Sequence, residues 1–147
     1  MRPVQAWACV GLIVACVGSL LPFARQRELM HRVPEVKPPA VLEYQAGEIL
    51  RKLGAVEAPA DHAVAYGVDG EFLRWAQEQD KSPHRWDRLA TGEPAVLSFW
   101  YRRSPRALVP FDDSGEIHWS DPPLTVSGMA GVRVDLGGRL LSFYRVP

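Results

Sequence analysis

Hydrophobic residues gather first at the N-terminus, where a nearly continuous apolar run extends from Val4 to Phe23. The only polar side chains within it are those of Gln5 and Ser19, and it carries no charge. An α-helix rises about 1.5 Å per residue, so about 20 residues of this kind can cross the hydrocarbon core of a bilayer. The pattern predicts one transmembrane helix within residues 1–30 and places the chain in the cell membrane as a single-pass protein.

Three fates of this segment are compatible with its sequence. An uncleaved signal anchor accounts best for the full length of the apolar run. A cleaved signal peptide would end at the small residues Val17–Ser19, but apolar sequence continues past them. Residues 13–16 resemble a lipobox that would place a lipid on Cys16, although apolar rather than polar residues follow it. We therefore expect a signal anchor.

Four small residues of the run share one face of the expected helix, because they recur at spacings of three and four positions. Such faces let helices approach closely in lipid, where van der Waals contact drives association. They predict contact with another transmembrane helix, although glycine and alanine are also common in spanning helices generally. The four residues are Ala8, Gly11, Ala15 and Gly18.

Two rules disagree about the orientation of this helix. Arg2 alone precedes the run, whereas Arg25, Arg27, Arg32 and Lys37 follow it. The positive-inside rule then favours a cytoplasmic C-terminal side. An N-terminal apolar segment that leads into a folded domain more often exports that domain, so we expect the remainder of the chain to be extracytoplasmic.

After the run, the period of the hydrophobic pattern changes several times. Prolines make residues 31–40 an extended spacer. Apolar residues on a helical stripe begin at Ala40, and Gly54 is suited to end that helix. Alternation from His62 onward predicts a strand, and Ser82-Pro83 is a typical helix start. The expected helices span residues 40–53, 71–79 and 83–91, and the expected strand spans residues 62–68.

From Pro94 onward the pattern is that of β-structure. Residues rich in β-formers alternate with polar turns, and Gly137-Gly138 predicts a tight hairpin turn. Two or three short helices followed by an antiparallel β-meander make residues 41–147 a small α+β domain. The expected strands span residues 95–103, 107–109, 117–119, 131–135 and 139–146.

Composition narrows the chemistry that is open to this domain. Lys and Arg number 17, as do Asp and Glu, so the basic excess of a nucleic-acid binder is missing. Both cysteines, Cys9 and Cys16, lie in the apolar run and leave the remainder without a disulfide or thiolate metal site. The four histidines are scattered, and the common nucleotide, metalloprotease and hydrolase motifs do not occur. We expect no catalytic residue, no cofactor and no metal.

Arginines and aromatic residues gather on the expected central strand and its turn, where no acidic residue lies between Pro94 and Phe111. The arginines can pair across neighbouring strands with the acidic residues of the turn at 112–116. Alternatively, an arginine beside an aromatic ring can hold a carboxylate or phosphate bidentately. This second interpretation predicts a site for a small anionic ligand or a protein partner. Its residues are Trp100, Tyr101, Arg102 and Arg106.

The chain from Pro39 to Pro147 carries a series of short motifs. They are Leu53-Gly54, Trp86–Leu89, Phe99–Pro105, Leu108–Pro110, Asp121–Leu124, Ser127–Met129, and Asp135 with Gly138–Leu140. The series resembles a segment of certain multi-domain bacterial membrane proteins with an N-terminal serine/threonine protein kinase domain, where it follows a spanning helix outside the kinase fold. The resemblance implies a membrane-tethered, non-catalytic sensory or partner-binding module linked to kinase signalling. Kinase motifs themselves are missing from this sequence, so phosphotransfer is not implied.

Residues 132–140, Val-Arg-Val-Asp-Leu-Gly-Gly-Arg-Leu, also resemble the last hairpin of PepSY/YPEB-type modules. That resemblance implies a module that restrains a protease or another partner by direct contact. The two alternatives differ in the surface that they require. A groove lined by Trp100 and an arginine would favour the first, and an exposed edge strand without a pocket would favour the second.

Overall fold

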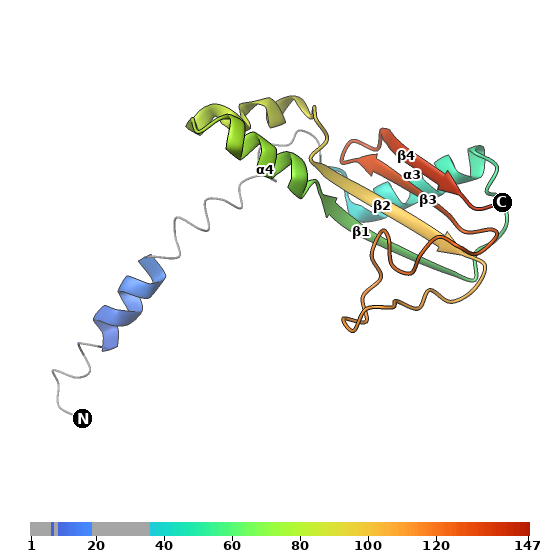
Figure 1. Ribbon diagram of the computed structural model, residues 1–147, viewed down its shortest axis with the longest axis horizontal. Coiled ribbons are helices and arrows are strands. Elements are labelled where there is room, and N and C mark those ends of the chain that lie inside the picture. The colour runs from blue at the N-terminus through green and yellow to red at the C-terminus, as the bar shows by residue number, and fades with distance from the viewer. Residues whose placement is uncertain (1–6, 8, 19–35) are drawn as a thin grey trace.

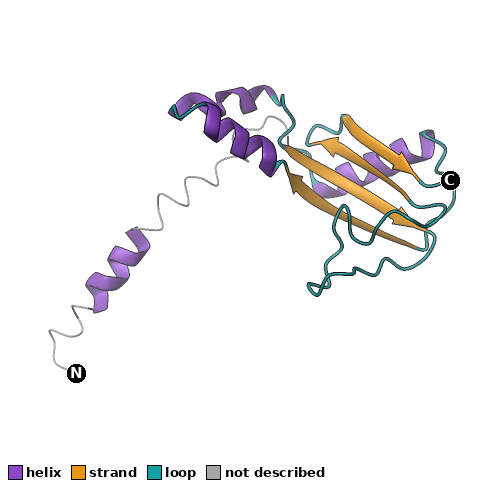
Figure 2. Ribbon diagram, viewed as in Figure 1, coloured by secondary structure: helices purple, strands orange, loops and turns teal. Residues whose placement is uncertain are grey.

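A four-stranded antiparallel sheet with a helix packed on one face forms the folded part of the chain in the computed structural model (Figure 1, Figure 2). The structure describes residue 7, residues 9–18 and residues 36–147. The elements follow in the order α3 (Pro39–Lys52), β1 (Asp61–Val68), α4 (Gly70–Gln79), the 3₁₀ helix η2 (Pro83–Thr91), β2 (Leu97–Ser104), β3 (Ala130–Asp135) and β4 (Leu140–Arg145). The predicted α+β class is confirmed.

Helix α3 and the central strands build the core. Pro39 lies in the first turn of the helix, where its missing N–H is not needed. Most of the apolar stripe predicted from the sequence is buried and packs mainly against β3 and β2, whereas Leu53, expected as its last member, is 42% exposed. The buried residues of this core are Leu42, Ala46, Leu50, Ala55, Leu97, Phe99, Ala130, Val132, Val134 and Leu136.

The strands lie in the order of the sequence, β1-β2-β3-β4, as a meander requires. β2 pairs with β1 from Asp61↔Ser104 to Val68↔Leu97 without interruption, and with β3 on its other side. Four predicted strands, residues 62–68, 95–103, 131–135 and 139–146, are thereby confirmed within two residues at each end. α4 and η2 are inserted between β1 and β2 and lie beyond the ends of these strands (Figure 1).

Two predicted strands, residues 107–109 and 117–119, are wrong. Both lie in the connection between β2 and β3, residues 105–129, which contains no strand. This connection folds irregularly over the face of the sheet that points away from α3 (Figure 2). Because β2 and β3 pair directly with each other, no position remains between them for a strand from the connection.

The helices after β1 begin in different ways. Asp69 caps α4, since its carboxylate accepts the backbone N–H of Phe72 at 2.9 Å. Ser82 was expected to cap the next helix, but its side chain makes no cap bond, and that helix is 3₁₀ rather than α. Gly92 ends it with a left-handed φ of 75°, so the predicted extent of this helix is confirmed.

The predicted transmembrane segment is described only in part. Residues 9–18 are helical, whereas Ala8 and residues 31–35 of the spacer lie outside the described residues. Within the described part of the chain, no helix combines the length and the apolarity needed to cross a bilayer. Gly11, Ala15 and Gly18 are exposed, and no described atom comes within 4 Å of a Cβ placed on Gly11 or Gly18.

The turn between β3 and β4 is closed at Gly138. Its φ is +88°, and its N–H donates to the carbonyl of Asp135 at 3.0 Å. The N–H of Asp135 in turn donates to the carbonyl of Arg139 at 2.9 Å. Residues with a side chain rarely adopt this backbone conformation, which is why the glycine pair marked the turn in the sequence.

We expect Gly138→Ala to lower the free energy of unfolding by about 1–2 kcal/mol, because a Cβ at positive φ is strained. The Cβ would also displace the side chain of Gln45. Gly137→Ala is the matched control, since Gly137 has no left-handed φ. Denaturant unfolding of the full chain measures both, and equal midpoints for the two variants would contradict the role of Gly138.

Candidate functional site

The four residues predicted as a binding site do not share one surface. Trp100 and Arg102 point to the face of the sheet away from α3, and they are only 4% and 1% exposed. Tyr101 points to the opposite face, where it packs against the core beside α3. Arg106 lies beyond the end of β2 and is exposed. Strand alternation separates these neighbours in sequence.

Arg102 is held by the backbone of the connection 105–129. One terminal nitrogen of its guanidinium donates to the carbonyl of His118, and the other donates to the carbonyl of Pro122 at 2.5 Å. None of the ion pairs among the described residues involves Arg102, so the predicted pairing with the acidic turn at 112–116 is not formed by this side chain. Arg102 therefore fastens the connection to the sheet.

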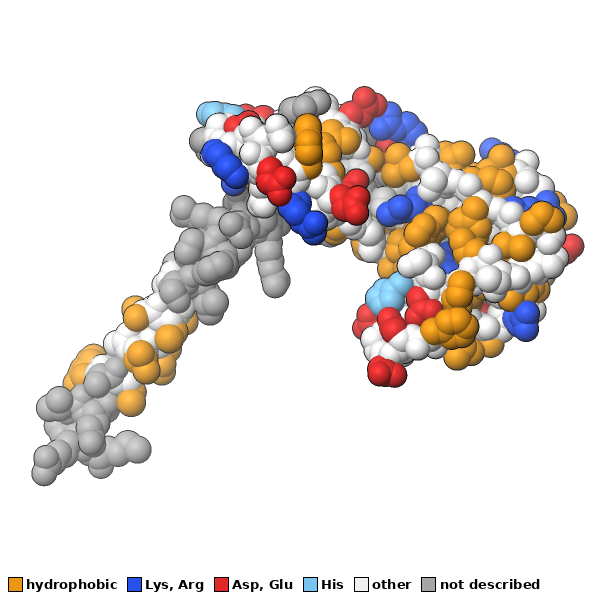
Figure 3. Space-filling model, in the orientation of Figure 1, with side chains coloured by type: hydrophobic (Ala, Val, Ile, Leu, Met, Phe, Trp, Pro, Cys, Tyr) orange, Lys and Arg blue, Asp and Glu red, His pale blue; other side chains and the backbone are white. Residues whose placement is uncertain are grey.

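Aromatic rings surround this contact. Trp119 of the connection lies 6.4 Å from the ring of Trp100 and 5.1 Å from that of Tyr144. The guanidinium carbon of Arg133 stands 5.2 Å from the Trp119 ring, a cation–π distance. Burial raises the pKa of the Tyr144 hydroxyl, and the nearby charge of Arg102 opposes that rise. Apolar side chains are visible over this face in Figure 3.

The sequence interpretation missed Trp119, Arg133 and Tyr144 as members of this cluster. Strand alternation alone places Arg133 on one face of β3, but only the register Trp100↔Arg133 shows that it is the face of Trp100. Gly131, a glycine in the interior of a strand, is the sequence feature that could have indicated this close packing. A Cβ there would lie 2.5 Å from the ring of Tyr144, so any other residue at this strand position would have to displace that ring.

Three histidines pair with carboxylates on the surface. The distances are 3.2 Å for His62–Glu43, 3.0 Å for His84–Asp87 and 3.5 Å for His118–Asp112, and each side chain is well exposed. A hydrogen bond from the Ser114 hydroxyl lowers the pKa of Asp112. No group of three metal-ligating side chains occurs within the described ranges. These pairs stand apart from one another on different elements.

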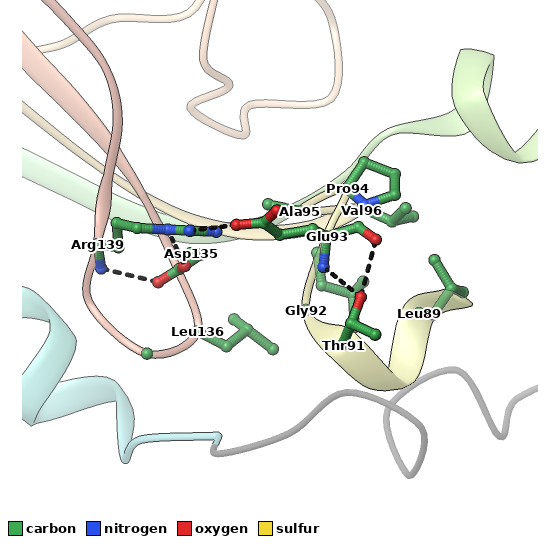
Figure 4. Close-up of a pocket in the computed structure, with 12 residues that line it drawn as sticks. Leu89, Thr91, Gly92, Glu93, Pro94, Ala95, Val96, Asp135, Leu136 and Arg139 are labelled. Carbon is green, nitrogen blue, oxygen red and sulfur yellow. Dashed lines mark hydrogen bonds and ion pairs between the residues drawn. The ribbon is translucent and has the colours of Figure 1, made fainter. Parts of the chain in front are cut away.

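A small cavity of about 200 Å³ lies between the approach to β2 and the β3–β4 turn (Figure 4). Arg139 reaches into this region and donates to Glu93 at 2.6 Å and to Asp135 at 3.0 Å. These two carboxylates raise the pKa of the Arg139 guanidinium. The charge of Arg139 is thereby neutralised by carboxylates of the same chain. The cavity is also smaller than most ligand pockets, which measure about 300–1,000 Å³.

A second hollow of about 350 Å³ is lined by Arg106 and by apolar residues of the connection. Phe111 and Val109 contribute to it although they are 78% and 63% exposed. Of the four predicted residues, Arg106 alone lines this hollow, and Trp100 and Tyr101 do not reach it.

Strand β1 forms one edge of the sheet, and no other described strand pairs with its outer side. On the α3 side, Tyr66 and Val68 of this strand are 38% and 56% exposed. α3 packs mainly on β3 and β2, and it therefore leaves Tyr66 and Val68 at the edge of the sheet partly exposed. The exposed edge and its apolar side chains together form a surface that an extended chain can approach.

A shallow groove lies between α3 and Tyr101 of β2, beside His62 of β1, and we call it the α3–β1 groove. It measures about 390 Å³ and is lined by Ala40, Glu43, Tyr44, Gly47, Glu48 and Tyr101. Tyr101 is the one predicted site residue in it. His62 stacks on Tyr101 at 5.7 Å between ring centroids and bonds Glu43. Burial raises the pKa of Tyr101, the charge of Arg103 opposes this, and the carboxylate of Glu43 adds to the rise.

We expect Arg102→Leu to lower the free energy of unfolding by about 2–4 kcal/mol, because the backbone carbonyls of His118 and Pro122 lose their charged donors. Arg106→Leu, at an exposed position, serves as the control and should change it by about 0.5 kcal/mol or less. Chemical denaturation measures both. If the second substitution Asp113→Arg restored the free energy of unfolding that Arg102→Glu removes, the partner of this arginine would instead be a carboxylate.

Comparison with known proteins assigns no family to the chain. No protein-family model matches it, and neither a curated protein nor a solved structure is significantly similar.

Proposed function

We propose that this chain is a membrane-tethered, non-catalytic module that binds an extended segment of a protein partner along the edge strand β1. The observation that supports this most directly is that the outer edge of β1 lacks the features that usually prevent pairing with another strand. From Ala63 to Val68 it contains neither charge nor proline, and its pairing with β2 has no bulge. Natural proteins usually protect an exposed edge with one of these devices.

The opposite edge of the same sheet is protected. β4 contains an extra residue, Leu141, where its register with β3 shifts at Arg133/Val134. A bulge of this kind bends the strand and interrupts the row of backbone groups that a further strand would need. The contrast between the two edges within one small sheet favours β1 as the edge that receives a partner.

The backbone of β1 offers the hydrogen-bonding groups for this pairing. The N–H of Asp69 donates to the carbonyl of Val96 at 2.9 Å, directly after the strand. In an antiparallel ladder such bonds recur at every second residue. Gly67, Ala65 and Ala63 therefore bond to β2, and Val64 and Tyr66 between them direct their N–H and C=O groups outward.

Both resemblances are compatible with this proposal. In a kinase-linked protein, an edge strand that captures an extended segment would report the presence of a partner. In a PepSY-like module, it would restrain a protease or another protein by direct contact. The edge strand favours a protein partner over a small anionic ligand in either setting, because backbone pairing requires another backbone. An in-frame kinase domain upstream would distinguish the two settings.

We expect a fluorescein-labelled heptapeptide, Thr-norleucine-Thr-Val-Thr-Val-Thr, to bind the full chain purified in mild detergent. N-methylation of one alternate set of its amides should weaken binding at least about tenfold, because several hydrogen bonds of about 1 kcal/mol are lost. N-methylation of the other set is the matched control and should have little effect. Fluorescence anisotropy measures both, and no binding, or equal effects of the two sets, would refute edge pairing.

Membrane attachment through the N-terminal apolar run is tested separately. We expect the full chain to remain in the membrane fraction after an alkaline carbonate wash, because the apolar run from Val4 to Phe23 is long enough to span. A variant that begins at residue 36 is the control and should appear in the supernatant. Recovery of a soluble form of the full chain that starts near residue 17 or 20 would show that the segment is cleaved.

A further inference from the structure

We infer that the α3–β1 groove is a specificity pocket for a lysine or arginine side chain of the segment that binds at β1. This inference rests on the proposed function and names the chemistry of the partner: an extended segment that places a cation beside apolar residues on one face. Three features of the groove lead to it, namely its position, its charge and the glycine in its wall.

The groove lies where a side chain of an added strand would enter. Its floor is Tyr101 of β2, which pairs in register with Val64 of β1. A strand added outside β1 would lie about 4.8 Å from it and would direct every second side chain to the α3 side of the sheet. Those side chains would meet Val64, Tyr66 and the mouth of the groove.

The charged residues that line the groove are both acidic. They are Glu43 and Glu48, and no lysine or arginine is among the lining residues. Glu48 is paired with Arg51 at 2.6 Å, outside the lining. Among the residues that the structure describes, the ion-pair partner of Glu43 is the imidazole of His62 at 3.2 Å. Glu43 is therefore the carboxylate that can receive a cation from a partner.

Gly47 shapes the wall of the groove. It lies in the interior of α3, where glycine is less favourable than alanine because it loses more backbone freedom on folding. No described atom comes within 4 Å of a Cβ placed on it, so packing within the chain does not explain the choice of glycine. The missing methyl group leaves the helix backbone open to the groove, next to the ring of Tyr44.

A long cationic side chain fits these features better than a short apolar one. Its methylene stem can lie along Gly47 and the ring of Tyr101 while its charged end stays near water and reaches Glu43. The tyrosine rings add a cation–π attraction for the same charge. An acidic side chain would meet the carboxylate of Glu43 at this position and would be repelled.

The experiment compares three heptapeptides that differ only at the second position, which is norleucine, lysine or glutamate. At low salt we expect the lysine peptide to bind the full chain about threefold to tenfold more tightly than the norleucine peptide, and the glutamate peptide to bind more weakly than both. Salt should reduce these differences, because the charges are partly exposed.

Variants locate the effect in the groove. Glu43→Gln should remove most of the preference for lysine over norleucine, whereas Glu57→Gln, at an exposed position away from the groove, should leave it unchanged. Gly47→Ala should raise the melting temperature of the chain and yet weaken binding of the lysine peptide several-fold. A purely structural role for Gly47 would leave binding unchanged.

The outcomes separate this inference from the proposed function. If the norleucine peptide binds with the expected dependence on N-methylation but lysine and glutamate bind equally well, edge pairing stands and the specificity pocket is refuted. If no peptide binds, the proposed function fails and the pocket with it. If lysine is preferred but Glu43→Gln and Gly47→Ala change nothing, the cation is recognised elsewhere and this inference is wrong.

Discussion

The mismatch in width between one helix and four strands determines which surfaces of this domain are open. Strands lie about 4.8 Å apart, so four of them span about 15–20 Å, whereas a helix with its side chains is about 10–12 Å wide. α3 therefore covers the central strands β2 and β3 and leaves the flanks at β1 and β4 partly exposed. Among the described helices, α3 is the one that packs on this face (Figure 2). The exposed edge at β1 and the groove beside it both follow from this constraint.

The other face of the sheet is covered in a different way. Instead of a helix, the irregular connection 105–129 lies over it, and an irregular segment has no regular row of hydrogen bonds for all of its backbone carbonyls. Arg102 supplies two donors for that purpose, and Trp119 adds aromatic contacts with the sheet. Burial of a guanidinium without a carboxylate partner is unfavourable by itself. Arg102 offsets this cost through its two hydrogen bonds to the connection, which contains no strand to pair with the sheet.

The two edges of the sheet have different consequences for binding. A bulge in β4 limits further pairing on that side, whereas β1 continues its register to the end of the strand. The groove beside β1 combines acidic side chains with an interior helical glycine that the packing of the chain does not require. A preference for contacts with another chain is a physical reason to retain a locally unfavourable residue.

The sequence by itself determined the elements that depend on local pattern. The apolar stripe of α3, the alternation in β1 and the glycine turn at Gly138 each follow from a period or a backbone requirement within a few residues. The four longer strands were predictable for the same reason. Residues 107–109 and 117–119 also favour strands locally, but a strand needs a neighbour, and the sheet had no free position between β2 and β3.

Only the tertiary structure decided the sites. Trp100, Tyr101 and Arg102 are adjacent in sequence, yet alternation along β2 directs them to opposite faces with different roles. Partners such as His118 and Glu43 come from segments that are distant in the chain and that meet only through register and helix packing. Charge and residue type along a sequence show which groups are available, whereas burial and long-range contact decide which of them face a partner.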